Sequence, residues 1–245
     1  MRSQLKITLL YLILVAFLPA ISMAGTWRDD FNGTALGSGW NFINDPNGTS
    51  SYKVANGWFS LHLVGTNDIW GGVDNSVKLL RDAPAGDYTI ETHIKIDPDA
   101  AAKTQNTWTN ILLFDDTNKP SSNWWYIARG GADEVNTEYV QNGTGNIQAS
   151  LKSIGDLDLY LKAEKVGQAY TGYYKIKKDD QWIKVGTYNH TTLNTKKVGL
   201  MDKSWAARNM VSNFDYFEMV GDKVEANIAV SPKEKLTSTW GQLKN

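Results

Sequence analysis

The sequence contains no cysteine among its 245 residues. This absence excludes disulfide bonds, thiolate metal sites, cysteine nucleophiles and a lipoprotein anchor. Neither sign of charge dominates, because 25 Lys and Arg residues oppose 26 Asp and Glu residues and leave a formal net charge of −1. A near-neutral chain without a basic stripe does not fit a nucleic-acid-binding protein, and we expect no nucleic-acid partner.

Histidine is also scarce, with three residues at His62, His93 and His190. They are far apart and form no His-x-His or His-Glu-x-x-His pattern, so no zinc site is indicated. No Gly-x-Ser-x-Gly sequence is present either, which leaves a serine hydrolase without its nucleophile. A polysaccharide lyase would need Tyr or His beside Arg on one sheet. Tyr126, Arg129 and His93 could be arranged in that way, although their spacing does not require it.

Long apolar runs are missing except near the N-terminus. Two basic residues precede an apolar run over residues 9–18, a proline ends it, and Ser22-Met23-Ala24 has the small-x-small pattern cut by signal peptidases. The run is shorter than the ~20 apolar residues that span a bilayer, and no later stretch is long enough. We therefore expect residues 1–24 to be a signal peptide cleaved near Ala24, a secreted or periplasmic protein, and no membrane span.

Alternation of apolar and polar residues with a period of two runs through the remaining sequence, and the helical period of 3.6 is almost absent. In residues 88–96 the apolar side chains fall on one face of a strand, and Glu91, His93 and Lys95 fall on the other. Turn signals such as Asn-Gly separate the segments. The expected strands are residues 27–31, 52–54, 58–64, 77–80, 88–96, 108–114, 124–128, 134–140, 147–153, 157–163, 169–177, 181–188, 197–201 and 211–220.

Many short strands without helical crossovers predict antiparallel sheets that pack as a sandwich or jelly roll. No repeat and no low-complexity linker divides this part of the chain, so one domain over residues 25–221 is expected. After residue 221 the alternation stops. We expect residues 222–245 to form a flexible C-terminal tail.

What the sequence does have in excess is Trp and Tyr, with 10 and 11 residues against 7 Phe. Sugars present apolar C–H faces that stack on aromatic rings, and hydroxyls that bond to amides and carboxylates. Adjacent strand residues point to opposite faces, so one of Trp124 and Trp125 is expected in the core and the other at the surface. The predicted ligand-binding residues are Trp70, Trp108, Trp125, Tyr126 and, as a donor to sugar hydroxyls, Arg129.

Short motifs along most of residues 25–221 occur in an order and spacing typical of a known family. They are residues 27–33 with Trp40, residues 87–92, 159–167, 170–174 with Trp182, 198–200 and 214–217. Together they resemble the non-catalytic C-terminal sandwich domain of family 43 β-xylosidases, within the concanavalin A-like lectin/glucanase superfamily. The resemblance implies an all-β fold, an antiparallel β-sandwich of concanavalin A-like jelly-roll form. Because the superfamily includes lectins, glycosidases, lyases and adaptors, the fold does not name the ligand.

A weaker resemblance concerns Glu134-Val135-Asn136-Thr137-Glu138. Family 16 glucanases of the same superfamily carry Glu-x-Asp-x-Glu on a concave strand, which implies Glu134 as nucleophile and Glu138 as acid/base. A retaining mechanism needs carboxyls ~5–5.5 Å apart, whereas Cα atoms four residues apart in a strand are ~13 Å apart, so the side chains would have to lean together. Here Asn136 replaces the central Asp. We therefore assign no catalytic residue and keep Glu134 and Glu138 as candidates.

The superfamily resemblance also implies one structural calcium ion, held by a carboxylate of the closing strand and by oxygens near the first strands. The matching positions are Asp30, the carbonyl of Gly57 and Asp215. Hard oxygens of this kind suit calcium. Asp215 could instead pair with a neighbouring side chain.

These observations predict a secreted carbohydrate-binding, lectin-like module that recognises an extracellular polysaccharide or glycan. A glycoside hydrolase or polysaccharide lyase acting on such a polymer is the alternative. A third possibility is a structural surface or matrix protein whose fold only presents loops.

Overall fold

The computed structural model describes residues 24–97, 106–117, 123–131 and 133–226. Within these ranges the chain forms strands and no helix. The strands are β1 (Gly25–Asp29), β2 (Asn41–Ile43), β3 (Ser51–Ala55), β4 (Trp58–Asn67), β5 (Ile69–Trp70), β6 (Val73–Asp74), β7 (Val77–Asp82), β8 (Tyr88–Asp97), β9 (Thr107–Phe114), β10 (Trp124–Gly130), β11 (Glu134–Gln141), β12 (Thr144–Lys152), β13 (Asp158–Val166), β14 (Ala169–Lys175), β15 (Ile183–Asn189), β16 (Lys197–Phe214) and β17 (Phe217–Gly221).

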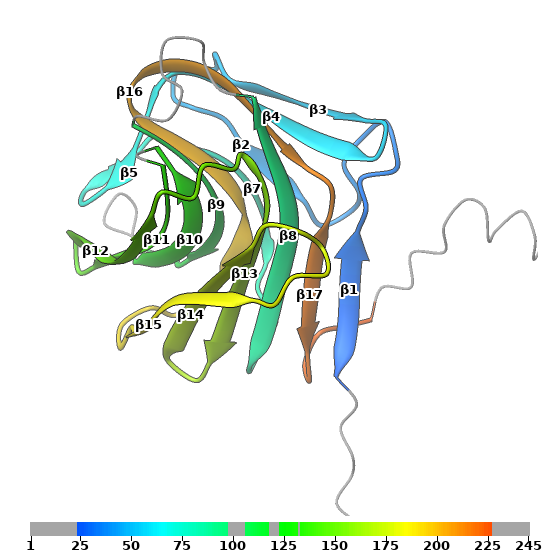
Figure 1. Ribbon diagram of the computed structural model, residues 1–245, viewed down its shortest axis with the longest axis vertical. Coiled ribbons are helices and arrows are strands. Elements are labelled where there is room, and N and C mark those ends of the chain that lie inside the picture. The colour runs from blue at the N-terminus through cyan, green and yellow to red at the C-terminus, as the bar shows by residue number, and fades with distance from the viewer. Residues whose placement is uncertain (1–23, 98–105, 118–122, 132, 227–245) are drawn as a thin grey trace, which may run out of the picture.

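Two antiparallel layers make up the molecule (Figure 1). The first sheet has the order β12-β11-β10-β9-β16-β7-β2. The second sheet runs β15-β14-β13-β8, and the free edge of β8 pairs with the end of β16 and with β17. Strands β4 and β3 extend the second sheet beside β16, and β1 extends it beside β17. The fold is therefore the predicted all-β antiparallel sandwich.

Strand β16 belongs to both sheets. Its first part pairs with β7 and β9, and its last part pairs with β4 and β8. The register shifts between Ser204 and Arg208, where the strand passes from one layer to the other. A shift of this kind bends a strand and changes its twist. The sequence pattern predicted two strands here, because the crossing segment carries polar residues that do not alternate with apolar ones.

The hydrophobic core lies between the two sheets, as the alternation predicts. In β8, the side chains of Tyr88, Ile90, Ile94 and Ile96 are buried in it, and the residues that alternate with them, such as His93 and Lys95, face the other side. The core also includes Val224. The packed chain thus extends past Gly221, where the sequence pattern placed the end of the domain.

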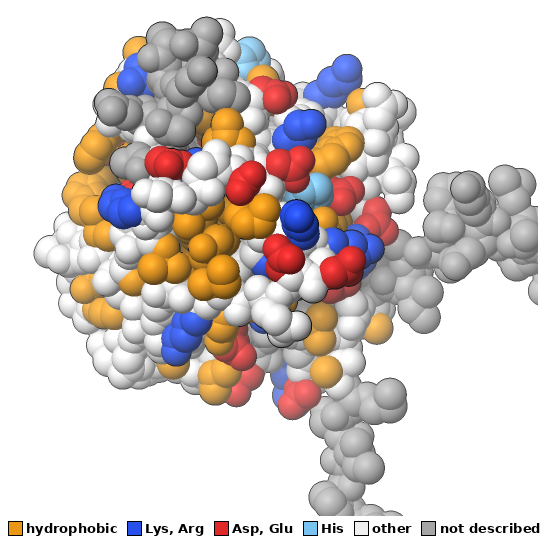
Figure 2. Space-filling view, viewed as in Figure 1, with side chains coloured by type: hydrophobic (Ala, Val, Ile, Leu, Met, Phe, Trp, Pro, Cys, Tyr) orange, Lys and Arg blue, Asp and Glu red, His pale blue; other side chains and the backbone are white. Residues whose placement is uncertain are grey.

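The expected signal peptide, apart from Ala24, lies outside the described residues, and so does the expected tail beyond residue 226. None of the residues that the structure describes forms a helix with the length and hydrophobicity that crossing a bilayer requires. On the side of the molecule shown in Figure 2, acidic and basic side chains are interspersed around hydrophobic ones. This face carries no extended patch of a single sign.

Candidate functional site

A second set of apolar side chains lies on the face of the first sheet that points away from the core, which we call the outer face. Its buried members are Ile69, Leu80, Trp108, Leu112, Phe114, Trp124, Tyr126, Ala128, Val140 and Met201. An outer face of a sandwich is normally polar, because water covers it. The hairpin β5–β6 lies on this side of the sheet, near β11 and β12 (Figure 1). This side of the sheet is therefore unusual, because apolar side chains are buried on a face that points away from the core.

The candidate carboxylates lie on this face. Strand periodicity places Glu134, Asn136 and Glu138 of β11 on one side, as predicted. The register between strands sets Glu138 opposite Tyr126 and Asn136 opposite Ala128. All three side chains are buried, and Glu138 is only 2% exposed.

Glu138 is held by three donors. Its Oε2 accepts hydrogen bonds from the Tyr126 hydroxyl and, at 3.0 Å, from Lys203 Nζ. Its Oε1 accepts from Asn136 Nδ2 at 2.8 Å. Lys203 and Glu138 form an ion pair with both side chains buried. Burial raises the pKa of Tyr126 well above its usual value, and the adjacent Glu138 raises it further, so this hydroxyl stays a donor.

Glu134 has a similar set of partners. Its Oε2 accepts hydrogen bonds from the Ser150 hydroxyl and Lys152 Nζ of β12. Its Oε1 accepts from Asn136 Nδ2 at 3.3 Å. Asn136 thus donates to both carboxylates and joins them. A neutral amide fits between two carboxylates as a donor, which a third carboxylate could not do.

This arrangement engages both candidate carboxylates in contacts within the protein. Retaining hydrolysis uses one carboxyl as general acid and the other as nucleophile. Here both oxygens of each carboxylate accept hydrogen bonds, and one oxygen of each carboxylate lies against a lysine ammonium. The two carboxylates thus belong to one hydrogen-bonded network, in which Oδ1 of Asn136 has no partner.

Aromatic rings surround the Lys203 ammonium. Its Nζ lies 4.7 Å from the centre of the Trp108 ring, 5.0 Å from Trp70 and 5.2 Å from Tyr126. Ring faces attract cations at this range. Trp70 comes from the hairpin β5–β6 and packs against Trp124 at a ring distance of 6.2 Å. The hairpin therefore covers part of the outer face.

One ring of this aromatic group remains open to solvent. Trp205 of β16 is 62% exposed, and its ring meets Trp108 edge to face at 5.4 Å. An exposed Trp ring beside a face lined with aromatic side chains is the kind of surface on which a sugar ring stacks.

Several buried polar atoms of the outer face have no hydrogen-bond partner. They are both side-chain polar atoms of Asn110, Oδ1 of Asn136 and Nε1 of Trp108. The register aligns Asn110 with Ala128 and Met201, and Ala128 with Asn136, so these atoms share a short stretch of the face. Buried polar groups normally have a partner in protein, water or ligand. Their clustering leaves several buried donors and acceptors without a protein partner on one short stretch of the face.

The predicted ligand-binding residues separate into two sets. Trp70, Trp108 and Tyr126 lie together on the outer face, next to Glu138. Trp125 is 0% exposed in the core between the sheets, where it packs against Tyr170 at 5.9 Å. The prediction that Trp125 contacts a ligand is therefore wrong, because its neighbour Trp124 takes the outer face.

Arg129 is also misplaced by the prediction. It lies on the core side of β10 with Trp125, and its guanidinium is buried at the strand end. It donates to the carbonyl oxygens of Gly130 and, at 2.8 Å, Asp156, and it pairs with Asp133 at 3.0 Å. Because the guanidinium nitrogens already donate to these acceptors, Arg129 holds the segments around Asp133 and Asp156 in place. It is not positioned to donate to a sugar.

The arrangement considered for a lyase does not form. Tyr126 lies on the outer face of the first sheet, and Arg129 lies on the core side of the same strand. His93 lies on the second sheet, where its ring contacts Asp158 at 2.7 Å and Asp215 at 3.2 Å and stacks on Tyr160. These three side chains do not meet.

The predicted calcium ligands lie at one end of the second sheet. The register sets Asp29 of β1 opposite Phe217 of β17, so Asp30 and Asp215 leave their strands at the same end. Asp30 Oδ1 accepts from Arg28 at 2.6 Å, and Asp215 Oδ2 contacts His93. The second oxygen of each carboxylate has no partner among the described residues, which suits a further cation contact. No group of three or more His, Asp or Glu that could hold a metal occurs in the described part of the chain, so the calcium site stays a prediction.

Three residues of the site escaped the sequence analysis. Lys203 and Trp205 lie in the part of β16 that the strand pattern left out. Asn110 lies inside an expected strand, where it is the polar residue on the same face as Trp108, Leu112 and Phe114. The interruption of apolar alternation at Asn110 is a signal that could have pointed to the face. Nothing in the local sequence indicates that Lys203 is enclosed by aromatic rings, because those rings come from other strands.

The fold and the outer face together define a concanavalin A-like sandwich domain. The family model of the β-xylosidase C-terminal concanavalin A-like domain matches residues 28–219. The chain belongs to this family, which confirms the resemblance found in its sequence. No curated protein matches the chain.

Solved structures with the same fold include enzymes that act on polysaccharides. A xylan β-1,4-xylosidase from Bacillus halodurans C-125 superposes with a TM-score of 0.61 at 18% identity, covering 78% of this chain and 38% of the xylosidase. The GH43 protein BlXynB from Bacillus licheniformis gives 0.60 at 18% identity, covering 79% and 39%. A β-1,3-1,4-glucanase (lichenase) from a mouse hindgut metagenome gives 0.57 at 12% identity, covering 82% and 100%.

This chain thus spans about two fifths of the length of the GH43 proteins it resembles. At these identities the likeness shows the fold alone.

Proposed function

We propose that this protein is a secreted carbohydrate-binding module that recognises an extracellular polysaccharide through the outer face of the first sheet. The observation that carries the proposal is the pairing of an exposed Trp205 with unsatisfied buried polar atoms on the same face. The ring of Trp205 offers a stacking surface, and Asn110, Asn136 and Trp108 offer hydrogen bonds. Sugar recognition needs both.

Binding is favoured over hydrolysis because of the state of the two carboxylates. Glu134 and Glu138 already accept hydrogen bonds at both oxygens, and Lys203 and Lys152 neutralise them. A polysaccharide that reaches this face meets a fixed polar network and aromatic walls. Each carboxylate that it meets there already accepts hydrogen bonds from neighbouring side chains.

The test measures retention of the purified protein on a panel of insoluble and soluble xylans, β-glucans, galactans and pectins. Trp205→Ala should weaken binding to the retained polymer by tenfold or more, since losing a stacked ring removes on the order of 1–3 kcal/mol. The high exposure of Trp205 means that the fold does not depend on it. Trp182→Ala is the matched control, because Trp182 lies against Lys162 and Lys175 of the second sheet.

A parallel measurement of reducing-sugar release separates binding from catalysis. Glu134→Gln should leave polymer retention nearly unchanged, and the wild-type protein should release no reducing sugar. If wild type hydrolyses one of these polymers and Glu134→Gln abolishes that activity, the protein is a glycoside hydrolase and the proposal is wrong. Equal retention of wild type and Trp205→Ala would instead remove the outer face from the binding site.

A further inference from the structure

A further feature of the molecule lies away from the outer face, at the edge where β1, β7 and the segment after β17 meet. A cavity of about 680 Å³ opens there. Trp27 of β1, Ser38 before β2, Arg81 of β7 and Lys223 and Glu225 after β17 line it. The volume lies within the range of small-molecule sites in proteins.

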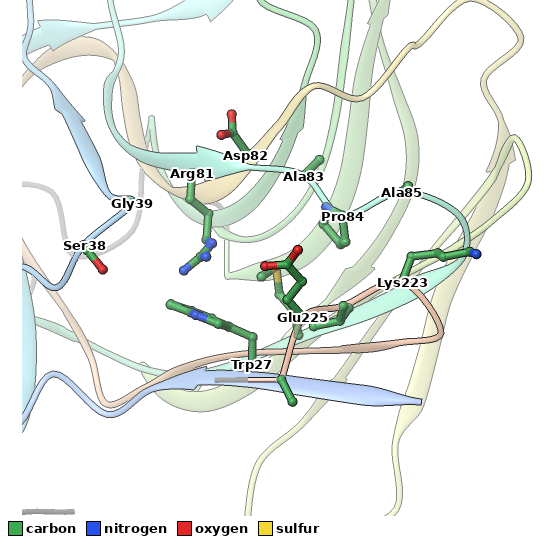
Figure 3. Close-up of a pocket in the computed structure, with 13 residues that line it drawn as sticks. Trp27, Ser38, Gly39, Arg81, Asp82, Ala83, Pro84, Ala85, Lys223 and Glu225 are labelled. Atoms are coloured by element: carbon green, nitrogen blue, oxygen red, sulfur yellow. The ribbon is translucent and has the colours of Figure 1, made fainter. Parts of the chain in front are cut away.

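Arg81 dominates this cavity. Figure 3 shows its side chain reaching from β7 toward the Trp27 ring, with the Glu225 carboxylate on the other side of the cavity. The guanidinium carbon lies 3.3 Å from the centre of the Trp27 ring and 5.3 Å from that of Trp40. Two indole rings therefore fix the plane of the guanidinium, so that little conformational entropy remains to be lost when it binds an acceptor.

Two nitrogens of this fixed guanidinium have no acceptor. Nε and Nη1 of Arg81 are buried without a hydrogen-bond partner, and the guanidinium makes no ion pair among the described residues. Its acidic neighbours are engaged elsewhere. Asp29 accepts from the Phe31 amide and from Trp40 Nε1, and Asp82 pairs with Lys197 at 2.6 Å. Burial lowers the pKa of Arg81 to about 10, so the group is still protonated at neutral pH.

Arg28 shows what an aromatic-stacked arginine looks like when its donors are used. It lies 3.8 Å from the Tyr216 ring centre, and it donates to Asp30 at 2.6 Å and to Glu218 at 3.3 Å. Arg81 has the same stacking without the acceptors. A stacked guanidinium with free donors at a cavity wall is arranged to take a carboxylate in two parallel hydrogen bonds.

The rest of the cavity selects among anions. Glu225 lines the same space as Arg81 and has no partner among the described residues. The Asp82 carboxylate points away from this space and pairs with Lys197. The negative charge of Glu225 opposes a dianion such as sulfate or phosphate more strongly than a single carboxylate, and its oxygens accept hydrogen bonds from hydroxyls. The Ser38 hydroxyl adds a neutral donor and acceptor. The matching ligand carries one carboxylate and several hydroxyls.

The geometry points to a binding site for a sugar acid at this cavity, with the uronate carboxylate on Arg81 and the ring hydroxyls toward Glu225 and Ser38. This inference does not depend on the proposed outer-face site. Variants of Trp205 leave this cavity intact, and variants of Arg81 leave the outer face intact, so the failure of one is distinguishable from the failure of the other.

The test is equilibrium binding of glucuronate and galacturonate to the purified protein, followed by calorimetry or by NMR shifts of the indole signals. The matched ligands are the methyl esters of both acids, and inorganic sulfate. Arg81→Gln removes the charge, and Arg81→Lys keeps the charge but loses the paired donors. Arg28→Gln is the matched control for the loss of an aromatic-stacked arginine, and the melting temperature of each variant shows whether it folds.

We expect one or both uronates to bind the wild-type protein and the Arg28→Gln variant alike. Arg81→Gln and Arg81→Lys should each weaken binding by tenfold or more, and the esters and sulfate should bind at least tenfold more weakly than the acids. The inference is overturned if neither uronate binds at millimolar concentration, or if folded Arg81→Lys and Arg81→Gln bind as the wild type does. Equal binding of the methyl esters or of sulfate would also overturn it, since the carboxylate would then not be what Arg81 recognises.

Discussion

The Lys203–Glu138 pair is the residue-scale feature that most determines the outer face. Two buried charges pay a large desolvation penalty, and their attraction offsets it only when other hydrogen bonds complete the network. Here the Tyr126 hydroxyl and the Asn136 amide donate hydrogen bonds to the Glu138 carboxylate, and aromatic rings surround the Lys203 ammonium. These contacts therefore join β11 and β16 in one hydrogen-bonded network.

Removing one partner of this pair should be costly. We expect Lys203→Met to destabilise the protein by about 3–5 kcal/mol, because Glu138 would remain buried without its counter-charge. The double variant Lys203→Met/Glu138→Gln should recover part of that loss. Urea denaturation of wild type, both single variants and the double variant measures the coupling. Single losses that simply add in the double variant would contradict the network.

Asp202 provides a second residue-scale test. It lies next to Lys203 in the chain but faces the core, where burial raises its pKa to about 7 against a smaller opposing effect of the Ser212 and Thr109 hydroxyls. Because the folded-state pKa exceeds the unfolded value of 3.8, the folded protein holds the proton between these two pH values. The free energy of unfolding should therefore fall as pH rises from about 4 to about 7, by at most about 4 kcal/mol from this group.

Guanidinium denaturation at pH 5 and pH 8 measures this effect. Asp202→Asn should weaken the pH dependence of the free energy of unfolding. Relative to the wild type, the variant should therefore be more stable at pH 8 than at pH 5. Asp82→Asn is the control, since Asp82 is exposed and should leave the slope nearly unchanged. A wild-type protein that is equally stable at both pH values would contradict the assigned role of Asp202.

Single residues also show where sequence reasoning reaches its limit. Strand periodicity placed Glu134, Asn136 and Glu138 on one face and separated Trp124 from Trp125. It could not say which face meets the opposite sheet, because that depends on the pairing of distant strands. The choice of Trp125 over Trp124 was wrong for this reason.

At the scale of elements, long strands with regular alternation were predictable and irregular ones were not. Residues 88–96 and 108–114 correspond closely to β8 and β9. The strands β2, β5 and β6 were missed, because two or three residues show no period. The sequence pattern did not show β16 as one continuous strand. Its residues pass from one layer to the other, so the side that faces the core is not the same along its length.

The hairpin β5–β6 is the element that covers the outer face, and Gly145 of β12 makes room for it. A Cβ atom at Gly145 would lie 2.5–2.8 Å from atoms of the Trp70 indole. Gly145→Ala should therefore displace the hairpin at an overpacking cost of about 1–3 kcal/mol. Hydrogen exchange of residues 69–74 should rise, and the exchange of β8 should not change.

Gly72→Ala is the matched control in the same hairpin, since a Cβ there meets nothing within 4 Å. It should leave the exchange of residues 69–74 close to the wild-type value. If Gly145→Ala and Gly72→Ala behave alike, Trp70 does not anchor the hairpin to β12.

For the whole molecule, the fold joins its two layers through one strand and has no disulfide to limit the unfolded state. Its stability rests on the core between the sheets and on the polar networks described above. An ion that binds only the folded state would add to this by mass action. Asp30, Asp215 and the carbonyl of Gly57 are the residues proposed to hold calcium.

The melting temperature tests this proposal on the intact protein. At a calcium concentration about a hundredfold above the dissociation constant, the native state gains about 2.7 kcal/mol, which for a domain of this size raises the melting temperature by about 5–10 °C. Asp215→Asn should abolish the rise. Asp158→Asn is the control, because Asp158 and Asp215 both contact His93 and only Asp215 is a proposed ligand. If protein first shown to be loaded with calcium melts at the same temperature after chelation, or if Asp158→Asn and Asp215→Asn lose the rise equally, these residues do not form a calcium site. The contacts of Asp215 and Asp30 with His93 and Arg28 would then account for both carboxylates.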